Sequence, residues 1–209
     1  MKKKKKKKGG SIVTEIVIVL DRSGSMSAIC SDAIGGFNNF IREQKKLPGK
    51  ANLTLAQFDN EYEIVHEHVP LKDVPELTDE TYHPRATTAL LDAIGRTIVK
   101  ADELKTKQVS FVILTDGCEN ASREYNRSQI FDLIKNRTES GWQFVFLAAN
   151  QDAIQAGGDI GIAKGQSLTF AHTGDGVKAA YSMTSSQVAG YRAGIESVGF
   201  SDDDRIKAE

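Results

Sequence analysis

Apolar and polar residues form two different patterns along this chain, and each pattern predicts one kind of element. Unbroken apolar runs bounded by polar residues are typical of strands buried on both faces of a parallel sheet. Such runs predict strands over residues 16–20, 109–115 and 142–149, and a shorter one over residues 167–171. Apolar residues at helical spacing predict helices within residues 26–47, from residue 88 onward, around residues 130–134, near residue 153 and over residues 177–191.

Residues 51–58 and 62–69 are also strand-like, and Asp59-Asn60 between them is typical of a tight hairpin turn. The second of these segments is polar on both faces, which predicts an edge strand. Elsewhere strands alternate with helices, a pattern that favours the α/β class. We therefore expect a single doubly wound, mostly parallel sheet with one antiparallel edge strand and helices on both faces.

Length and composition favour one domain, because the chain has 209 residues and is 40% hydrophobic. We expect the domain to span residues 11–197. Residues 1–10 are lysine-rich and predict a tag or a disordered tail, whereas the charged residues 198–209 predict a C-terminal tail that is frayed over residues 201–209.

The net charge of −1 hides an acidic domain, because seven of the 27 basic residues are the lysines at positions 2–8. Without them, 20 basic residues remain against 28 acidic ones, a net charge of −8. This balance does not favour nucleic-acid binding. Glu15 interrupts the apolar run that would otherwise resemble a secretory signal, and no stretch approaches the ~20 apolar residues of a membrane span. We therefore expect a cytoplasmic monomer without a membrane partner, with Cys30 and Cys118 as free thiols.

The candidate chemistry begins directly after the first predicted strand. Asp21, Ser23 and Ser25 alternate with Arg22 and Gly24, so an extended or gently curled loop brings three oxygen-bearing side chains toward one point. One carboxylate and two hydroxyls form a site for a hard cation. The alternative is local: Asp21 caps a helix, and the two serines satisfy turn amides.

Two later stretches add oxygen ligands of the same kind. Thr87-Thr88 opens a predicted helix with hydroxyl groups, and Asp116 ends the strand over residues 109–115, followed by Gly117. In an open parallel sheet, ligands bind beyond the carboxyl ends of the strands, where Asp21 and Asp116 are both expected. Asn150 and Asp152, which follow the next strand, are expected at the same rim.

Taken in order, Asp21-x-Ser23-x-Ser25, then Thr88, then Asp116 resemble the signature of the von Willebrand factor A (VWA) family and its metal-ion-dependent adhesion site (MIDAS). The resemblance covers roughly residues 14–193. Within the family, the chain resembles the stand-alone VWA domains of the bacterial or phage-like type. We match Thr88, and not Thr87, to the threonine of the family signature, because the residues that follow Thr88 have the spacing of the family's helix. The resemblance implies a Rossmann-like fold and Mg²⁺ or Mn²⁺ held by these five residues. It also implies a partner protein that presents an Asp or Glu.

The alternative function is a metal-assisted hydrolase or phosphatase that uses Asp21. Haloacid dehalogenase-like phosphatases have Asp-x-Asp at such a position, but here Ser23 replaces the second carboxylate. No base is evident beside Ser23 or Ser25 in the sequence, and Gly-x-Gly-x-x-Gly is missing after the first strand, which disfavours a dinucleotide site. The sequence therefore predicts a binding module and not an enzyme. Arg22 and Arg85 flank the site and either orient an anionic partner or are solvated charges.

Overall fold

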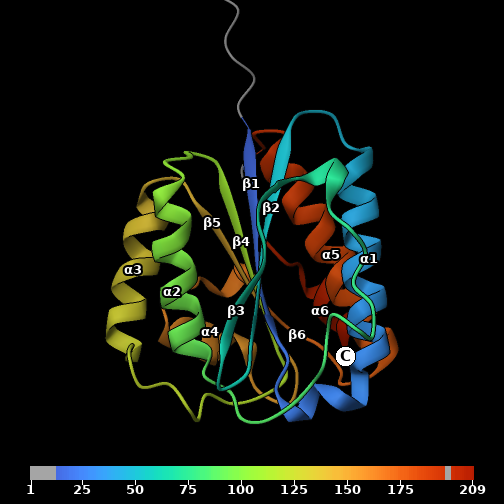
Figure 1. Cartoon of the computed structure of the whole chain (residues 1–209), viewed down its shortest axis with the longest axis vertical. Helices are drawn as coiled ribbons and strands as arrows, with labels where there is room; N and C mark the ends of the chain where they lie inside the picture. Colours follow the sequence, from blue (N-terminus) through green and yellow to red (C-terminus); the bar gives the residue numbers. More distant parts are fainter. Residues whose placement is uncertain (1–12, 196–198) are drawn as a thin grey trace, which may run out of the picture.

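The computed structural model describes residues 13–195 and 199–209, and a six-stranded sheet forms the centre of this part of the chain (Figure 1). The order of the strands across the sheet is β3-β2-β1-β4-β5-β6. Their bounds are β1 Thr14–Asp21, β2 Ala51–Phe58, β3 Tyr62–Pro70, β4 Val109–Thr115, β5 Gln143–Ala148 and β6 Ser167–Thr169. Neighbouring strands are parallel except for β2 and β3, so the predicted mostly parallel sheet with an antiparallel edge strand is confirmed.

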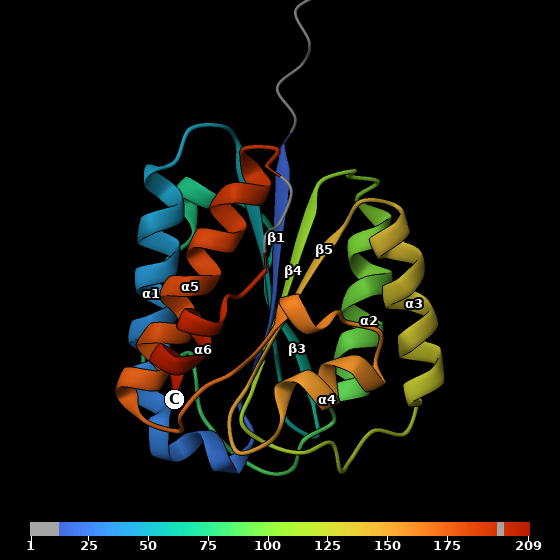
Figure 2. The same cartoon turned by 180° about the vertical axis from the view of Figure 1, so that it is seen from behind.

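Helices cover both faces of this sheet, as Figures 1 and 2 show from opposite sides. One face carries α1 (Cys30–Lys46), α5 (Gly174–Arg192) and α6 (Asp202–Ala208), and the other carries α2 (Leu90–Glu103) and α3 (Arg127–Glu139). The short α4 (Ala153–Asp159) precedes β6. The described residues also form three 3₁₀ turns: η1 (Gly24–Ile29), η2 (Leu71–Asp73) and η3 (Lys164–Gln166).

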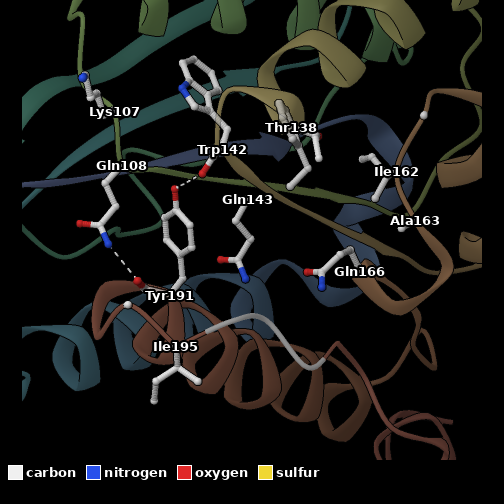
Figure 3. A pocket seen from close by; sticks show the side chains of 14 residues that line it. Lys107, Gln108, Thr138, Trp142, Gln143, Ile162, Ala163, Gln166, Tyr191 and Ile195 are labelled. Atoms are coloured by element: carbon white, nitrogen blue, oxygen red, sulfur yellow. Dashed lines mark hydrogen bonds between the residues drawn. The ribbon is translucent and has the colours of Figure 1, made fainter.

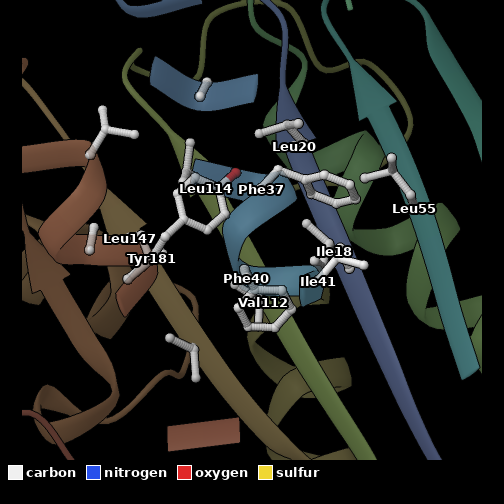
Figure 4. Close-up of a cluster of buried hydrophobic side chains, with 14 of the residues drawn as sticks. Ile18, Leu20, Phe37, Phe40, Ile41, Leu55, Val112, Leu114, Leu147 and Tyr181 are labelled. Atoms are coloured by element: carbon white, nitrogen blue, oxygen red, sulfur yellow. The ribbon is translucent and has the colours of Figure 1, made fainter. Parts of the chain in front are cut away.

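Strand β1 lies in the middle of the sheet, and all eight of its residues are buried. Because side chains alternate along a strand, Ile16, Ile18 and Leu20 join the core beneath α1 and α5. Figure 4 shows Ile18 and Leu20 in this core. Val17 and Val19 join the second core beneath α2 and α3. Burying an aliphatic side chain of this size contributes roughly 1.5–3 kcal/mol, so β1 is held from both faces.

The chain reverses its direction across the sheet beside β1, because β2 pairs with one edge of β1 and β4 with the other. Asp21 is the last residue of β1, and Asp116 directly follows β4. Parallel strands end on the same side, so the two carboxylates meet at this switch point. The loops that carry them lie at the lower end of the molecule in Figure 1.

The prediction of a frayed C-terminal tail is wrong. Residues Asp202–Ala208 form α6, which begins with a capping box between Ser201 and Asp204. Phe200 and Ala208 are buried in the core beneath α1 and α5, and the Ala208 carbonyl accepts a hydrogen bond from the backbone N–H of Ala171. Two apolar contacts therefore anchor a segment whose other residues are mostly charged. The predicted lysine-rich segment 1–10 lies outside the described residues.

Within the described part of the chain, Cys30 and Cys118 are both free thiols. Their positions differ: Cys30 begins α1 and is half-buried, whereas Cys118 is exposed beside Asp116. None of the described helices combines the length and the hydropathy that crossing a bilayer requires.

Candidate metal centre

Asp21 places a buried carboxylate at the end of β1. Its Oδ1 accepts a hydrogen bond from the backbone N–H of Ser23 at 2.6 Å, and its Oδ2 accepts one from Thr115 Oγ1 at 2.5 Å. Burial raises the pKa of Asp21 to about 6. The two hydrogen bonds lower this pKa, whereas the nearby charge of Asp116 raises it further. A cation beside it would favour the ionised form, because opposite charges stabilise one another.

The hydroxyl groups of the first loop connect Asp21 to the second carboxylate. Ser23 Oγ lies 3.2 Å from Ser25 Oγ, and Ser25 Oγ donates a hydrogen bond to Asp116 Oδ1 at 2.6 Å. Ser23 is buried, whereas Ser25 is exposed. The site is therefore anchored in the sheet and open to solvent at Ser25.

Gly117 shows that three hydroxyl groups surround one point. A Cβ at Gly117 would lie 2.9 Å from Thr88 Oγ1, 3.5 Å from Ser25 Oγ and 3.6 Å from Ser23 Oγ. The structure thus brings together the five residues that the sequence singled out. Thr88 is the threonine that reaches this point, whereas Thr87 is exposed and lines a separate polar pocket.

The prediction that Thr87-Thr88 opens a helix is wrong, because α2 begins at Leu90. The loop before it is held by Asn120, whose Oδ1 accepts from the Thr88 N–H at 3.0 Å and whose own N–H donates to the Thr88 carbonyl at 3.0 Å. Tertiary contacts satisfy these backbone groups, so the Thr88 hydroxyl is turned toward the site instead of capping the helix.

The sequence predicted that Arg22 and Arg85 either orient an anionic partner or are solvated charges. In the structure, both side chains pair with Asp59. Asp59, whose side chain is fully buried, accepts hydrogen bonds on the same Oδ2 from Arg22 Nε at 3.2 Å and from Arg85 Nε at 2.7 Å. Arg22 Nη1 also pairs with Glu63 at 2.6 Å, and Arg85 pairs with Glu61. The two arginines therefore tie the Ser23–Ser25 loop and the Thr88 loop to the β2–β3 hairpin.

The backbone of the same loops is joined directly. The N–H of Arg85 donates to the carbonyl of Arg22 at 2.7 Å, and the N–H of Gly24 donates to the carbonyl of Ala86 at 3.1 Å. Ala86 has a φ of 57°, a left-handed conformation that costs a non-glycine residue about 1–2 kcal/mol. The surrounding hydrogen bonds offset this strain and hold the Thr88 loop against the Ser23–Ser25 loop.

His172 is a residue of this site that the sequence reasoning missed. It follows β6, and its Nε2 lies 2.8 Å from Asp116 Oδ2. The rule that ligands gather beyond the carboxyl ends of parallel strands pointed to the residues after β6 as well. Of the two other rim residues, Asn150 lies 3.5 Å from the Asp116 carbonyl through its Nδ2, whereas Asp152 caps α4.

The five converging side chains fit a hard divalent cation. Their donors are carboxylate and hydroxyl oxygens, which hard cations prefer. Nowhere in the described part of the chain do three or more His, Cys, Asp or Glu side chains form a group that could hold a metal. A cation at this site therefore depends on the hydroxyls of Ser23, Ser25 and Thr88 as much as on the two aspartates.

Comparison with solved structures decides the fold. The vWF domain of the type V pili tip protein Mfa5 from Porphyromonas gingivalis matches with a TM-score of 0.64 at 11% identity, covering 93% of this chain and all of that one. The chain has a von Willebrand factor A fold. No protein-family model matches the sequence, and no curated protein matches it.

Two structures of proximal thread matrix protein 1 from the mussel byssus also share the VWA fold. One has a TM-score of 0.63 at 13% identity and covers 86% of this chain and 47% of that one. The other, described as having a zinc-occupied MIDAS motif, has a TM-score of 0.62 at 12% identity, with coverages of 86% and 46%. This chain thus spans about half the length of the mussel structures.

A pocket of about 800 Å³ lies at the opposite end of the sheet (Figure 3). It is lined mainly by apolar groups near the amino ends of β4 and β5, including Trp142, Phe144 and Ile162. Tyr191 also lines the pocket. Its backbone carbonyl accepts a hydrogen bond from Gln108 Nε2, and its hydroxyl donates one to the Gly141 carbonyl. The pocket and the candidate metal centre occupy different ends of the VWA fold.

Gly117→Ala is expected to weaken Mg²⁺ binding by at least about tenfold, about 1.4 kcal/mol. The added Cβ would occupy the point around which the three hydroxyls gather. The matched control is Gly158→Ala in α4, where nothing in the described structure outside the backbone of α4 lies within 4 Å of the new Cβ. Titration calorimetry with MgCl₂ measures the affinity, and wild-type binding by Gly117→Ala would contradict the assignment.

Proposed function

We propose that this chain is a metal-dependent protein-binding module. Asp21, Ser23, Ser25, Thr88 and Asp116 hold Mg²⁺ or Mn²⁺, and a partner protein binds through an exposed Asp or Glu. The observation that carries the proposal is the convergence of three hydroxyl groups at Gly117, beside two carboxylates, at the switch point of the sheet.

The donor set favours Mg²⁺ or Mn²⁺ among divalent cations. Two carboxylates balance the charge of one divalent cation, and three hydroxyls add neutral oxygens. Mg²⁺ keeps several waters and is usually bound by one or two carboxylates, whereas Ca²⁺ takes about 6–8 oxygens. Zn²⁺, which occupies the MIDAS motif of one mussel structure, is bound in proteins mainly by nitrogen and sulfur ligands.

A carboxylate is the partner group that this surface fits best. A bound cation would supply a Lewis-acid position for an anionic oxygen. Arg22 and Arg85 are both paired with Asp59, so recognition of an anion depends on the cation and not on these guanidinium groups. Gly24 and Ser25 are exposed, which leaves the site accessible to a protruding side chain.

The alternative, a hydrolase using Asp21, has less support from the geometry. Both oxygens of Asp21 accept hydrogen bonds inside the protein, which leaves the carboxylate poorly placed to attack a substrate. A serine nucleophile needs a general base beside its hydroxyl, most often the histidine of a catalytic triad. Here Asp116 lies between Ser25 and His172, so the order of the three groups differs from that of a catalytic triad. We therefore propose that the chain binds without turnover.

A displayed peptide library selected on the immobilised protein in MgCl₂ tests this proposal. We expect the retained peptides to share an Asp or Glu, to elute with EDTA, and to lose binding when that residue is changed to Asn or Gln. Parallel assays with p-nitrophenyl phosphate are expected to show no hydrolysis. Peptides that bind equally well in EDTA, or hydrolysis that disappears in Asp21→Ala, would contradict the proposal.

A further inference from the structure

His172 reaches the metal centre from a part of the chain that carries none of the five proposed ligands. Its Nε2 lies 2.8 Å from Asp116 Oδ2, and the side chain of Asp116 is fully buried whereas that of His172 is 22% exposed. A carboxylate oxygen can only accept a hydrogen bond, so Nε2 is the donor. The imidazole therefore contacts a proposed metal ligand from its outer side.

The backbone around His172 is held from several directions. The N–H of Phe170 donates a hydrogen bond to the Ala148 carbonyl in β5 at 3.0 Å. The N–H of Ala171 donates one to the Ala208 carbonyl at 2.7 Å. A Cβ at Gly176 would approach the Ala171 carbonyl to 2.1 Å, so α5 packs closely on this turn. His172 is thus presented to Asp116 by a fixed loop.

The hydrogen bond from His172 limits which oxygen of Asp116 is available to a cation. Oδ2 accepts from His172 and Oδ1 accepts from Ser25 Oγ, so each oxygen has its own partner. The oxygens of Asp21 are divided in the same way, between the Ser23 N–H and Thr115. A cation that took the place of the Ser25 contact would meet Oδ1 of Asp116, because Oδ2 is held by the imidazole of His172.

We propose that His172 is a positioning residue that makes Asp116 a one-oxygen ligand and so sets a preference for Mg²⁺ over Ca²⁺. The inference rests on the proposed function, in that the site binds a divalent cation. Mg²⁺ demands a near-octahedral shell at about 2.0–2.1 Å, whereas Ca²⁺ accepts a larger, irregular shell and often both oxygens of a carboxylate. Holding Oδ2 away from the cation favours the smaller shell.

The test compares His172→Ala with His172→Gln by titration calorimetry, using MgCl₂ and CaCl₂ separately. Loss of an outer hydrogen-bond partner of a metal ligand typically costs about 10–100-fold in affinity, so Mg²⁺ binding by His172→Ala is expected to fall in that range. Ca²⁺ binding should fall less, which lowers the Mg²⁺-to-Ca²⁺ affinity ratio by about tenfold. His172→Gln is expected to restore most of the ratio, because its amide N–H can donate to the same oxygen.

His68→Ala is the matched control. His68 Nδ1 lies 2.8 Å from Glu15 Oε2, so this variant also removes a histidine that contacts a buried carboxylate, but on the edge strand β3. Both affinities are expected to stay at the wild-type values. An unchanged Mg²⁺-to-Ca²⁺ ratio in His172→Ala, with the wild type binding Mg²⁺, would overturn this inference alone. A wild type that binds neither cation would overturn the proposed function and this inference together.

Discussion

Asp116→Ala is expected to abolish Mg²⁺ and Mn²⁺ binding, a loss of more than about 100-fold or 2.7 kcal/mol. The variant removes one of only two carboxylates and also the acceptor of the Ser25 hydroxyl. Asp21→Ala should act in the same way, because it removes the charge at the end of β1. Titration calorimetry measures the loss, and circular dichroism should show an unchanged fold since neither substitution opens the hydrophobic core.

Asp152→Ala controls for the loss of a carboxylate at the same rim of the sheet. Asp152 is exposed, and its Oδ1 caps α4 by accepting from the N–H groups of Ile154 and Gln155. Removing it should cost about 1 kcal/mol of stability and leave the metal affinity unchanged. If both Asp21→Ala and Asp116→Ala bind Mg²⁺ with full affinity, the cation binds elsewhere on the protein.

Gly36→Ala is expected to destabilise the fold by about 1–3 kcal/mol or more, because α1 and α5 pack too closely for a methyl group at this position. A Cβ at Gly36 would lie 2.3 Å from Cδ2 and 2.8 Å from Cε2 of the Tyr181 ring. Tyr181 is buried in the core and packs against Phe40, as Figure 4 shows, so the ring has little room to move. Urea denaturation measures the change in the free energy of unfolding.

The neighbouring Gly35→Ala is the matched control. It lies in the same helix, but apart from the backbone of α1 itself nothing in the described structure is within 4 Å of the added Cβ. Alanine is favoured over glycine inside a helix by roughly 0.5–1 kcal/mol, so this variant should be slightly more stable than wild type. Equal stabilities of the two variants would show that α1 and α5 separate more easily than the structure implies.

Most of the fold was predictable because its signals are local. The apolar run at residues 16–20 identifies a central strand by itself, and the polar segment 62–69 identifies the edge strand. The end of the chain was mispredicted for the opposite reason. Phe200 and Ala208 are the main apolar anchors of the C-terminal segment, and their burial depends on α5 and β6 being in place.

Some residues of the candidate site were predictable from local sequence, whereas others were not. Asp21, Ser23 and Ser25 are close in sequence, and the strand ends bring Asp116 to them, so sequence reasoning could single out these residues. Thr88 needed the family resemblance as well, because the expected helix start at Thr87-Thr88 lies two residues before the actual start of α2. The metal they are proposed to hold is a prediction that calorimetry will test.

The sequence by itself determined the order of the elements, the helices on both faces of the sheet and the residues that end its strands. Unbroken apolar runs, helical spacing and the polar residues that bound each run encode all three. Tertiary structure alone decided which polar groups pair. Arg22 and Asp59 are 37 residues apart, and Asp116 and His172 are 56 apart. Such pairs form only after the parallel strands have brought their carboxyl ends together, since a buried charge is stable only beside a partner that the completed fold supplies.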